Sequence, residues 1–133
     1  MHASDSVVSY VPYAARWPYE VHVVLREHRP SLAHCTPGEL TELAGVLQAV
    51  TRGYDRLFAR PFPYVMVVHQ APTDGRHDGH LHVEFYPPLR TADKLKYAAG
   101  CEQGAGTFLV DVMPEDAALA LRGAIGAAAE HGP

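Results

Sequence analysis

The sequence contains little of what several large classes of protein require. Its only two cysteines, Cys35 and Cys101, form no CxxC pair, so no disulfide framework is expected and we interpret both as reduced thiols. Eleven lysines and arginines stand against 15 aspartates and glutamates, a formal net charge of -4 that disfavours a nucleic-acid partner. No apolar run approaches the roughly 18 residues of a membrane-spanning helix, and the first residues do not resemble a signal peptide. We therefore expect a cytoplasmic protein with no membrane partner.

What the sequence does contain is the composition of an ordinary folded domain. Its 133 residues are 47% hydrophobic and 20% charged, and no linker or repeat divides them, so we expect a single domain over residues 1–133. Nine histidines are many for this length, and three of them lie between residues 77 and 82. These histidines are the first candidates for a functional site.

Alternating and β-branched segments predict the strands. They cover Ser6–Val11, Tyr19–Leu25, Tyr64–His69, His80–Tyr86 and Thr107–Val112. The segment from Gln70 to Gly79 contains a proline and two Asp-Gly pairs, which are typical of a hairpin loop.

Two helices are expected. Thr36, Pro37 and Glu39 form a helix opening with a capping box, and apolar residues then recur every three or four positions, which predicts a helix over residues 37 to 59. A second helix opens at Pro114 and ends near residue 129. The predicted core consists of Leu40, Leu43, Leu47, Val65, Val67, Leu81, Val83 and Phe85. The fold class is α+β, an antiparallel sheet of about five strands with the long helix on one face and the C-terminal helix alongside.

One strand face carries the candidate chemistry. Side chains alternate along a strand, so His80, His82 and Glu84 share a face, and a simple hairpin register places His69 opposite His80 on the same side. Four groups would then converge. Imidazoles and a carboxylate suit zinc or iron, but one imidazole could instead attack phosphorus, or the face could simply be solvated with Glu84 pairing to a histidine.

Five segments carry a family resemblance. They are Pro12–Glu20, Phe62–Tyr64, His69–Pro72, Leu81–Leu89 and Lys96–Glu102. In this order they resemble the C-terminal half of galactose-1-phosphate uridylyltransferase, a branch of the histidine-triad superfamily, over the run from Val11 to Arg122. The resemblance implies a histidine-triad-type domain that acts in galactose metabolism.

The resemblance also implies partners. In the family a histidine takes uridylyl from UDP-glucose and passes it to galactose 1-phosphate, so the implied substrates are a UDP-hexose and a hexose 1-phosphate. The family's nucleophile lies in a His-Pro-His motif of the N-terminal half, and this sequence has no such motif. The sequence is therefore expected to be either a truncated piece of the enzyme or a separately encoded half, and in the second case a separate N-terminal half is an implied partner. A homodimer through the aromatic segment Tyr10–Tyr19 is also expected.

Residue roles follow from the resemblance alone. His69 and His82 match ligands of a structural divalent metal, zinc or iron, and Glu84 takes the position of a further histidine ligand, with His80 nearby as a substitute. The family's last ligand is a glutamate of the N-terminal half, so the resemblance implies that a lone chain holds an incomplete shell and binds the metal more weakly. Lys96, Glu102 and the backbone around Ala99 match positions that contact the hexose and its phosphate.

Two other functions stay open. A free-standing histidine-triad enzyme would use His82 as nucleophile on a nucleoside phosphate. A nucleotide-sugar binding module would use the same residues without turnover.

Overall fold

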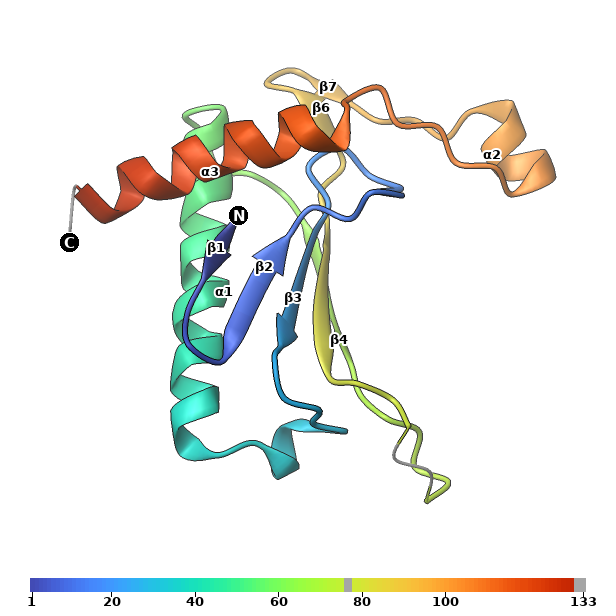
Figure 1. Ribbon diagram of the computed structural model, residues 1–133. Helices are drawn as coiled ribbons and strands as arrows, with labels where there is room; N and C mark the ends of the chain where they lie inside the picture. Colours follow the sequence, from blue (N-terminus) through green and yellow to red (C-terminus); the bar gives the residue numbers. More distant parts are fainter. Residues whose placement is uncertain (76–77, 131–133) are drawn as a thin grey trace.

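Five antiparallel strands form the main sheet of the computed structural model, which describes residues 1–75 and 78–130. The strands are β1 (His2–Ala3), β2 (Val7–Tyr10), β3 (Val21–Leu25), β4 (Val65–His69) and β5 (His82–Tyr86). Their order across the sheet is β1-β2-β3-β5-β4, so β5 is a central strand and β4 an edge strand (Figure 1). The predicted α+β class and strand number are confirmed, although β1 was not among the predicted strands.

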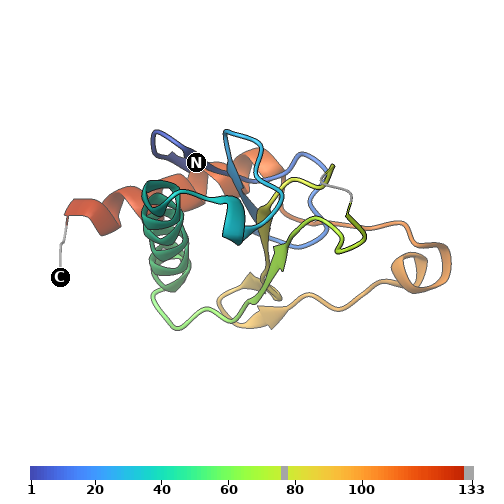
Figure 2. The same cartoon turned by 90° about the horizontal axis from the view of Figure 1, so that it is seen from below.

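Helix α1 (Pro37–Leu57) covers one face of this sheet (Figure 2). It begins as predicted, because the Thr36 hydroxyl accepts the Glu39 N–H at 3.2 Å while the Glu39 carboxylate accepts the Thr36 N–H at 2.7 Å. A short 3₁₀ turn, η1 (Leu32–His34), precedes it. Glu39 also pairs with Arg29, at 2.9 Å, so the start of α1 is tied to the chain that leaves β3.

The core lies between α1 and the sheet. Its fully buried members include Val7, Val21, Val23, Val46, Val50, Tyr54, Leu81, Val83, Phe85 and Leu121. Two predicted core residues are wrong, since Leu40 is 39% exposed and Val65 is 58% exposed. Leu47 and Val67 are half-buried. The error at Val65 has a simple cause, because Val65 lies opposite Tyr86 in the ladder and therefore shares the polar face of Glu84, which α1 does not cover.

Helix α3 (Pro114–Glu130) crosses α1 and confirms the predicted C-terminal helix. The crossing is closest at Gly53, where an added Cβ would lie 2.6 Å from Cγ1 of Ile125. A glycine is therefore required at this contact. No helix among the described residues is both long and apolar enough to traverse a bilayer.

Between β5 and α3 the chain forms an arm that reaches away from the helical side of the molecule (Figure 2). It contains the small hairpin β6 (Leu89–Thr91) and β7 (Lys94–Leu95), then the short helix α2 (Gly100–Ala105). The predicted strand over Thr107–Val112 is wrong, since this segment is extended without pairing to a strand. Its Leu109 N–H donates instead to the Glu102 carboxylate, at 3.1 Å.

Candidate functional site

The register of β4 and β5 decides which histidines meet. His69 lies opposite His82, two residues beyond the predicted partner His80. The loop takes up the difference, because Ala71 N–H and Leu81 N–H donate to the carbonyls of Pro30 and Arg29 rather than to each other. A shift of two residues preserves the face of the sheet, so the candidate cluster survives the error.

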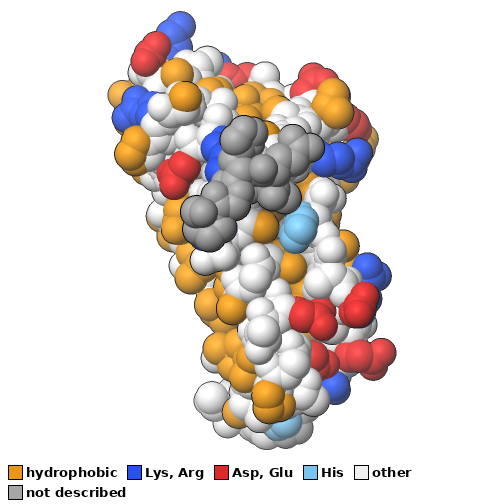
Figure 3. Space-filling view, turned by 90° about the vertical axis from the view of Figure 1, so that its left-hand side faces the viewer, with side chains coloured by type: hydrophobic (Ala, Val, Ile, Leu, Met, Phe, Trp, Pro, Cys, Tyr) orange, Lys and Arg blue, Asp and Glu red, His pale blue; other side chains and the backbone are white. Residues whose placement is uncertain are grey.

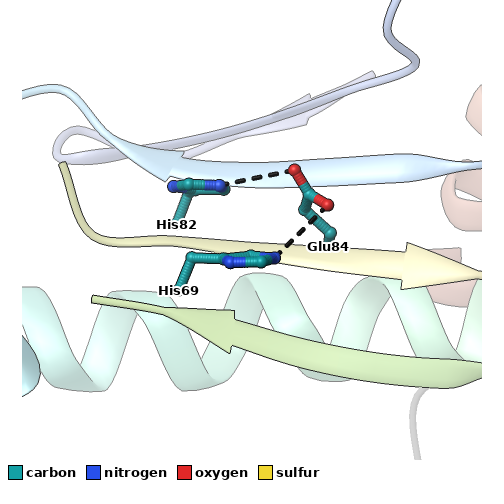
Figure 4. Close-up of side chains that lie close together, drawn as sticks. All are labelled: His69, His82 and Glu84. Carbon is teal, nitrogen blue, oxygen red and sulfur yellow. Dashed lines mark ion pairs between the residues drawn. The ribbon is translucent and has the colours of Figure 1, made fainter. Parts of the chain in front are cut away.

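Three side chains converge on the face opposite α1. His82 Nε2 lies 3.3 Å from Oε1 of Glu84, and His69 Nε2 lies 3.4 Å from Oε2 of the same carboxylate (Figure 4). The two imidazoles stack, with ring centroids 4.7 Å apart. Among the described residues these three form the group whose ligand atoms all lie within 4.8 Å of one another.

His80 does not join this group, so the predicted convergence of four ligands is wrong. Its Nε2 lies 2.9 Å from the carbonyl oxygen of Leu25, and its ring stacks on His28 at 5.4 Å. Its contribution to the cluster comes from its backbone. The Nδ1 of His82 lies 2.8 Å from the His80 carbonyl oxygen. Because a carbonyl only accepts, Nδ1 carries the proton, and in the neutral ring the lone pair is on Nε2, which faces Glu84.

The carboxylate of Glu84 is the centre of a wider cluster. Burial raises the pKa of Glu84. The hydrogen bond from the Tyr86 hydroxyl and the neighbouring His22, His69 and His82 lower this pKa by more than burial raises it, so it lies below the usual value. The Tyr86 hydroxyl donates a hydrogen bond to the Glu84 carboxylate. Burial and this hydrogen bond raise the pKa of Tyr86 to about 12. Glu84 is therefore held as an anion.

His22 and Glu20 extend the cluster, and sequence reasoning missed their place in it. His22 Nε2 lies 2.9 Å from Glu20 and 3.6 Å from Glu84. Glu20 is 4% exposed and also accepts the backbone N–H groups of Arg16 and Trp17. Their place could have been found only from the pairing of β3 with β5, which puts His22 directly opposite Glu84.

The cluster fits a divalent transition metal. Two ligands each about 2.1 Å from a tetrahedral zinc lie about 3.4 Å apart, close to the two observed nitrogen to oxygen distances. His69 Nε2 is buried without a hydrogen-bond partner, which a metal would supply. Two imidazoles and a carboxylate are also a donor set that zinc and iron accept.

A second group lies in the arm and contains the predicted substrate residues. Lys96 Nζ donates to Glu102 Oε1 at 2.7 Å, and the two side chains are 9% and 4% exposed. Glu102 accepts the Ala99 N–H at 2.6 Å, and Lys96 lies over the Trp17 ring at 5.3 Å. The Lys96 pairing and these backbone N–H groups lower the pKa of Glu102 to about 2.

Cavities border both of these groups. One of about 360 Å³ is lined by Lys96, Ala99 and Glu102 together with Arg90 and Asp111, which form an ion pair. A second of about 280 Å³ is lined by Arg16, Glu20, His22, Glu84 and Tyr86. Arg16 belongs to the second cavity and stacks on Phe108 of the arm at 4.8 Å. Charged side chains line both cavities, and the first is also lined by the apolar Leu109 and Val110.

Comparison with known proteins gives a consistent result. Residues 1–131 match the family described as galactose-1-phosphate uridyl transferase, C-terminal domain. A galactose-1-phosphate uridylyltransferase from Thermotoga maritima is 43% identical over 125 residues, 92% of this chain and 39% of the relative. A solved uridylyltransferase structure aligns with a TM-score of 0.87 at 36% identity, covering 95% of this chain and 40% of that one. This chain thus spans about two fifths of the length of these relatives.

A more distant structure supports the fold alone. A zinc-bound histidine triad family protein from Mycobacterium smegmatis aligns with a TM-score of 0.64 at 15% identity, covering 95% of this chain and 82% of that one. The predicted histidine-triad-type architecture is confirmed.

Proposed function

Because this chain belongs to the galactose-1-phosphate uridyl transferase family as its C-terminal domain, we propose that it supplies the metal-holding and sugar-phosphate-holding half of a uridylyltransferase site. In this proposal the substrates are a UDP-hexose and a hexose 1-phosphate. The nucleophilic histidine is supplied by the family's N-terminal half, since no His-Pro-His occurs in these 133 residues.

The observation that carries the proposal is the convergence of His69, His82 and Glu84 on one face of the sheet. The three residues come from two strands, so a shared ion would join the edge strand β4 to the central strand β5. A metal held here would supply structural cross-linking, because these ligands lie on the scaffold. Which of zinc and iron is preferred is left to measurement of the metal-loaded chain.

The sugar phosphate is proposed to bind beside Lys96. The Lys96 ammonium is enclosed and already oriented by Glu102 and Trp17, so little side-chain freedom is lost when it contacts a phosphate. The backbone around Ala99 and the Glu102 carboxylate face the same cavity, where they can accept or donate hydrogen bonds to hexose hydroxyls.

Calorimetric titration of galactose 1-phosphate into the purified chain tests this assignment. Lys96→Met is expected to abolish measurable binding, whereas Lys94→Met, an exposed lysine two residues earlier, is expected to leave the affinity unchanged. Equal affinities for the two variants, with both folded by circular dichroism, would contradict the proposed subsite.

Uridylyl exchange between UDP-glucose and galactose 1-phosphate tests the division of labour. The chain alone is expected to show only background exchange, and addition of an N-terminal half that carries His-Pro-His is expected to raise the rate. Turnover by the chain alone would refute the proposal.

A specific geometry favours one second function, a histidine-triad transferase or hydrolase with His82 as nucleophile. The His80 carbonyl directs the lone pair of His82 to Nε2, the atom that would attack phosphorus. Hydrolysis of a nucleoside phosphoramidate by the chain alone, lost in His82→Ala and kept in His28→Ala, would support this function over the first.

We also propose that the exposed edge of β4 is the surface on which a second copy of this chain packs. The residues Tyr64, Val65, Met66 and Val68 are 40% to 58% exposed, and an edge strand has unpaired backbone groups on its outer side. The earlier expectation of an interface at Tyr10–Tyr19 is weaker, because Tyr19 packs on Phe58 within the chain, although Tyr13 is 88% exposed.

Sedimentation equilibrium across micromolar concentrations tests this surface. The wild-type chain should associate, and Val65→Lys should be monomeric with unchanged thermal stability. A monomeric wild-type chain at every concentration would contradict it.

A further inference from the structure

A hollow on the helical side of the molecule belongs to neither group described above. It lies between the N-terminal strand, α1 and α3, has a volume of about 260 Å³, and is lined among others by His2, Gln48, Arg52 and Arg122. Since α1 covers the face of the sheet opposite Glu84, the hollow is separated from the histidine cluster by the core.

The charge of the hollow has one sign. Its two arginines extend from different helices, and its lining includes no aspartate or glutamate. Among the carboxylates of the described residues none forms an ion pair with Arg52 or Arg122. Glu42, one turn before the hollow on α1, is occupied by the hydroxyls of Ser4 and Ser6 at 2.6 Å. Positive charge is thus gathered here without its own counterion.

The amine of Met1 also experiences the positive charge at the hollow. The N-terminal amine of Met1 also lines the hollow and donates to the Ser9 carbonyl at 3.1 Å. Partial burial lowers the pKa of this amine, and the charge of Arg122 lowers it further. The hollow is therefore lined by a second kind of positive group beside its arginines.

Two glycines keep the hollow open. A glycine inside a helix destabilises it relative to alanine, so it calls for a reason. Gly53 has one in its contact with Ile125, but Cβ atoms added at Gly45 and Gly126 would meet nothing within 4 Å. Both of these glycines line the hollow, one from each helix, and larger side chains at either position would fill it.

Arginine pairs recognise phosphate in a particular way. Each guanidinium presents a planar fork of N–H donors that matches two oxygens of a phosphate, and it stays charged at every physiological pH. The Gln48 amide and the His2 ring add donors beside them. The volume is below the usual range for a drug-sized ligand, roughly 300–1,000 Å³, so the occupant must be small.

We propose that this hollow between α1 and α3 is a binding site for a small polyvalent phosphate anion, such as a diphosphate or a phosphate monoester, held by Arg52 and Arg122. In the space-filling view of this side, basic and acidic side chains both lie over the upper half around a histidine, and a further group of carboxylates lies at the lower right (Figure 3). The site is independent of the sugar-phosphate cavity of the arm.

Isothermal titration with sodium pyrophosphate in metal-free buffer tests the site. The wild-type chain should bind one equivalent, and Arg52→Gln/Arg122→Gln should bind at least tenfold more weakly. The matched control is Arg26→Gln/Arg56→Gln, which removes the same charge from exposed arginines elsewhere and should bind like the wild type. Lys96→Met should also bind like the wild type, which separates this site from the proposed substrate cavity.

A second variant tests the volume without altering the charge. Gly126→Leu should fill the hollow, keep or raise the thermal stability, and weaken pyrophosphate binding at least tenfold. Citrate, a polyvalent anion without phosphorus, should bind more weakly than pyrophosphate to the wild type.

Three results would each overturn the proposal: no saturable pyrophosphate binding to the wild type, equal binding by the arginine pair variant and its control, or citrate binding as tight as pyrophosphate. Loss of binding in Lys96→Met with retention in Arg52→Gln/Arg122→Gln would move the anion to the arm and equally refute this site.

Discussion

The two faces of strand β5 differ in almost every property although their residues alternate along five positions. Val83 and Phe85 are at most 1% exposed and pack against α1 and its neighbours. His82, Glu84 and Tyr86 are half-buried, and each forms a hydrogen bond or ion pair with other groups on that face or its rim. One strand therefore contributes to the core with one face and to the candidate site with the other.

The comparison teaches that, in β5, the residues that stabilise the fold and the residues of the candidate site lie on opposite faces of the sheet and alternate within one segment of the chain. The apolar face fixes the strand, which holds the three ligand atoms at their spacing before any ion arrives. The same principle does not hold for the arm, where Lys96 and Glu102 are fixed by each other and by backbone groups. Variants on each side should therefore have different consequences.

The largest effect is expected from Phe85→Ala. Phe85 is fully buried and its ring meets those of Tyr54 and Tyr64 at 5.8 and 5.3 Å, so the truncation leaves a cavity. The free energy of unfolding should fall by about 3–5 kcal/mol in urea titrations. Tyr97→Ala truncates an aromatic that is 80% exposed and should change stability by less than about 0.5 kcal/mol. Similar losses for the two would contradict the role of Phe85 as part of the buried scaffold.

A smaller loss is expected where the scaffold helix begins. Thr36→Ala removes the hydroxyl that accepts the Glu39 N–H, and it should lower the free energy of unfolding by about 1 kcal/mol. Thr41→Ala is the control, because its hydroxyl bonds a carbonyl within the helix and caps nothing. Metal affinity should be unchanged in Thr36→Ala, since the cap lies on the far side of the sheet. A loss of metal binding in this folded variant would contradict the separation of scaffold from site.

The contribution of Glu102 in the arm to stability should depend on pH in the acid range. The pKa of Glu102 is lowered to about 2 in the folded chain, so its ionised form adds stability above the unfolded pKa of about 4.3 and loses it as the pH falls towards about 2. The gap in melting temperature between the wild type and Glu102→Gln should therefore shrink between about pH 4.3 and pH 2. Glu115→Gln, at the start of α3, is the control, and a constant gap for Glu102→Gln would show that its carboxylate charge adds nothing.

Much of the scaffold could be predicted because its signals are local. The capping box at Thr36, the apolar periodicity of α1 and the alternation of β5 each lie within a few residues, and all three appear in the structure. The face shared by His82 and Glu84 followed from alternation alone.

The errors arose where distant segments decide the outcome. The hairpin register depends on Arg29 and Pro30, which take the hydrogen bonds of Leu81 and Ala71 and push His80 out of the ladder. Val65 has the residue type of a core strand, but its pairing with Tyr86 places it on the polar face of the sheet, away from α1. The segment Thr107–Val112 has strand composition but pairs with no strand of the described residues, and its Leu109 N–H donates to the Glu102 carboxylate instead.

Metal titration tests the central claim, that the polar face of β5 is a preorganised metal site, most directly. Cobalt(II), whose visible absorption reports a tetrahedral site that zinc would share, should bind the purified chain with one equivalent. His69→Ala/His82→Ala should weaken binding by about a hundredfold or more, while His28→Ala/His34→Ala should bind like the wild type. Unchanged cobalt binding in the folded His69→Ala/His82→Ala variant would contradict the account.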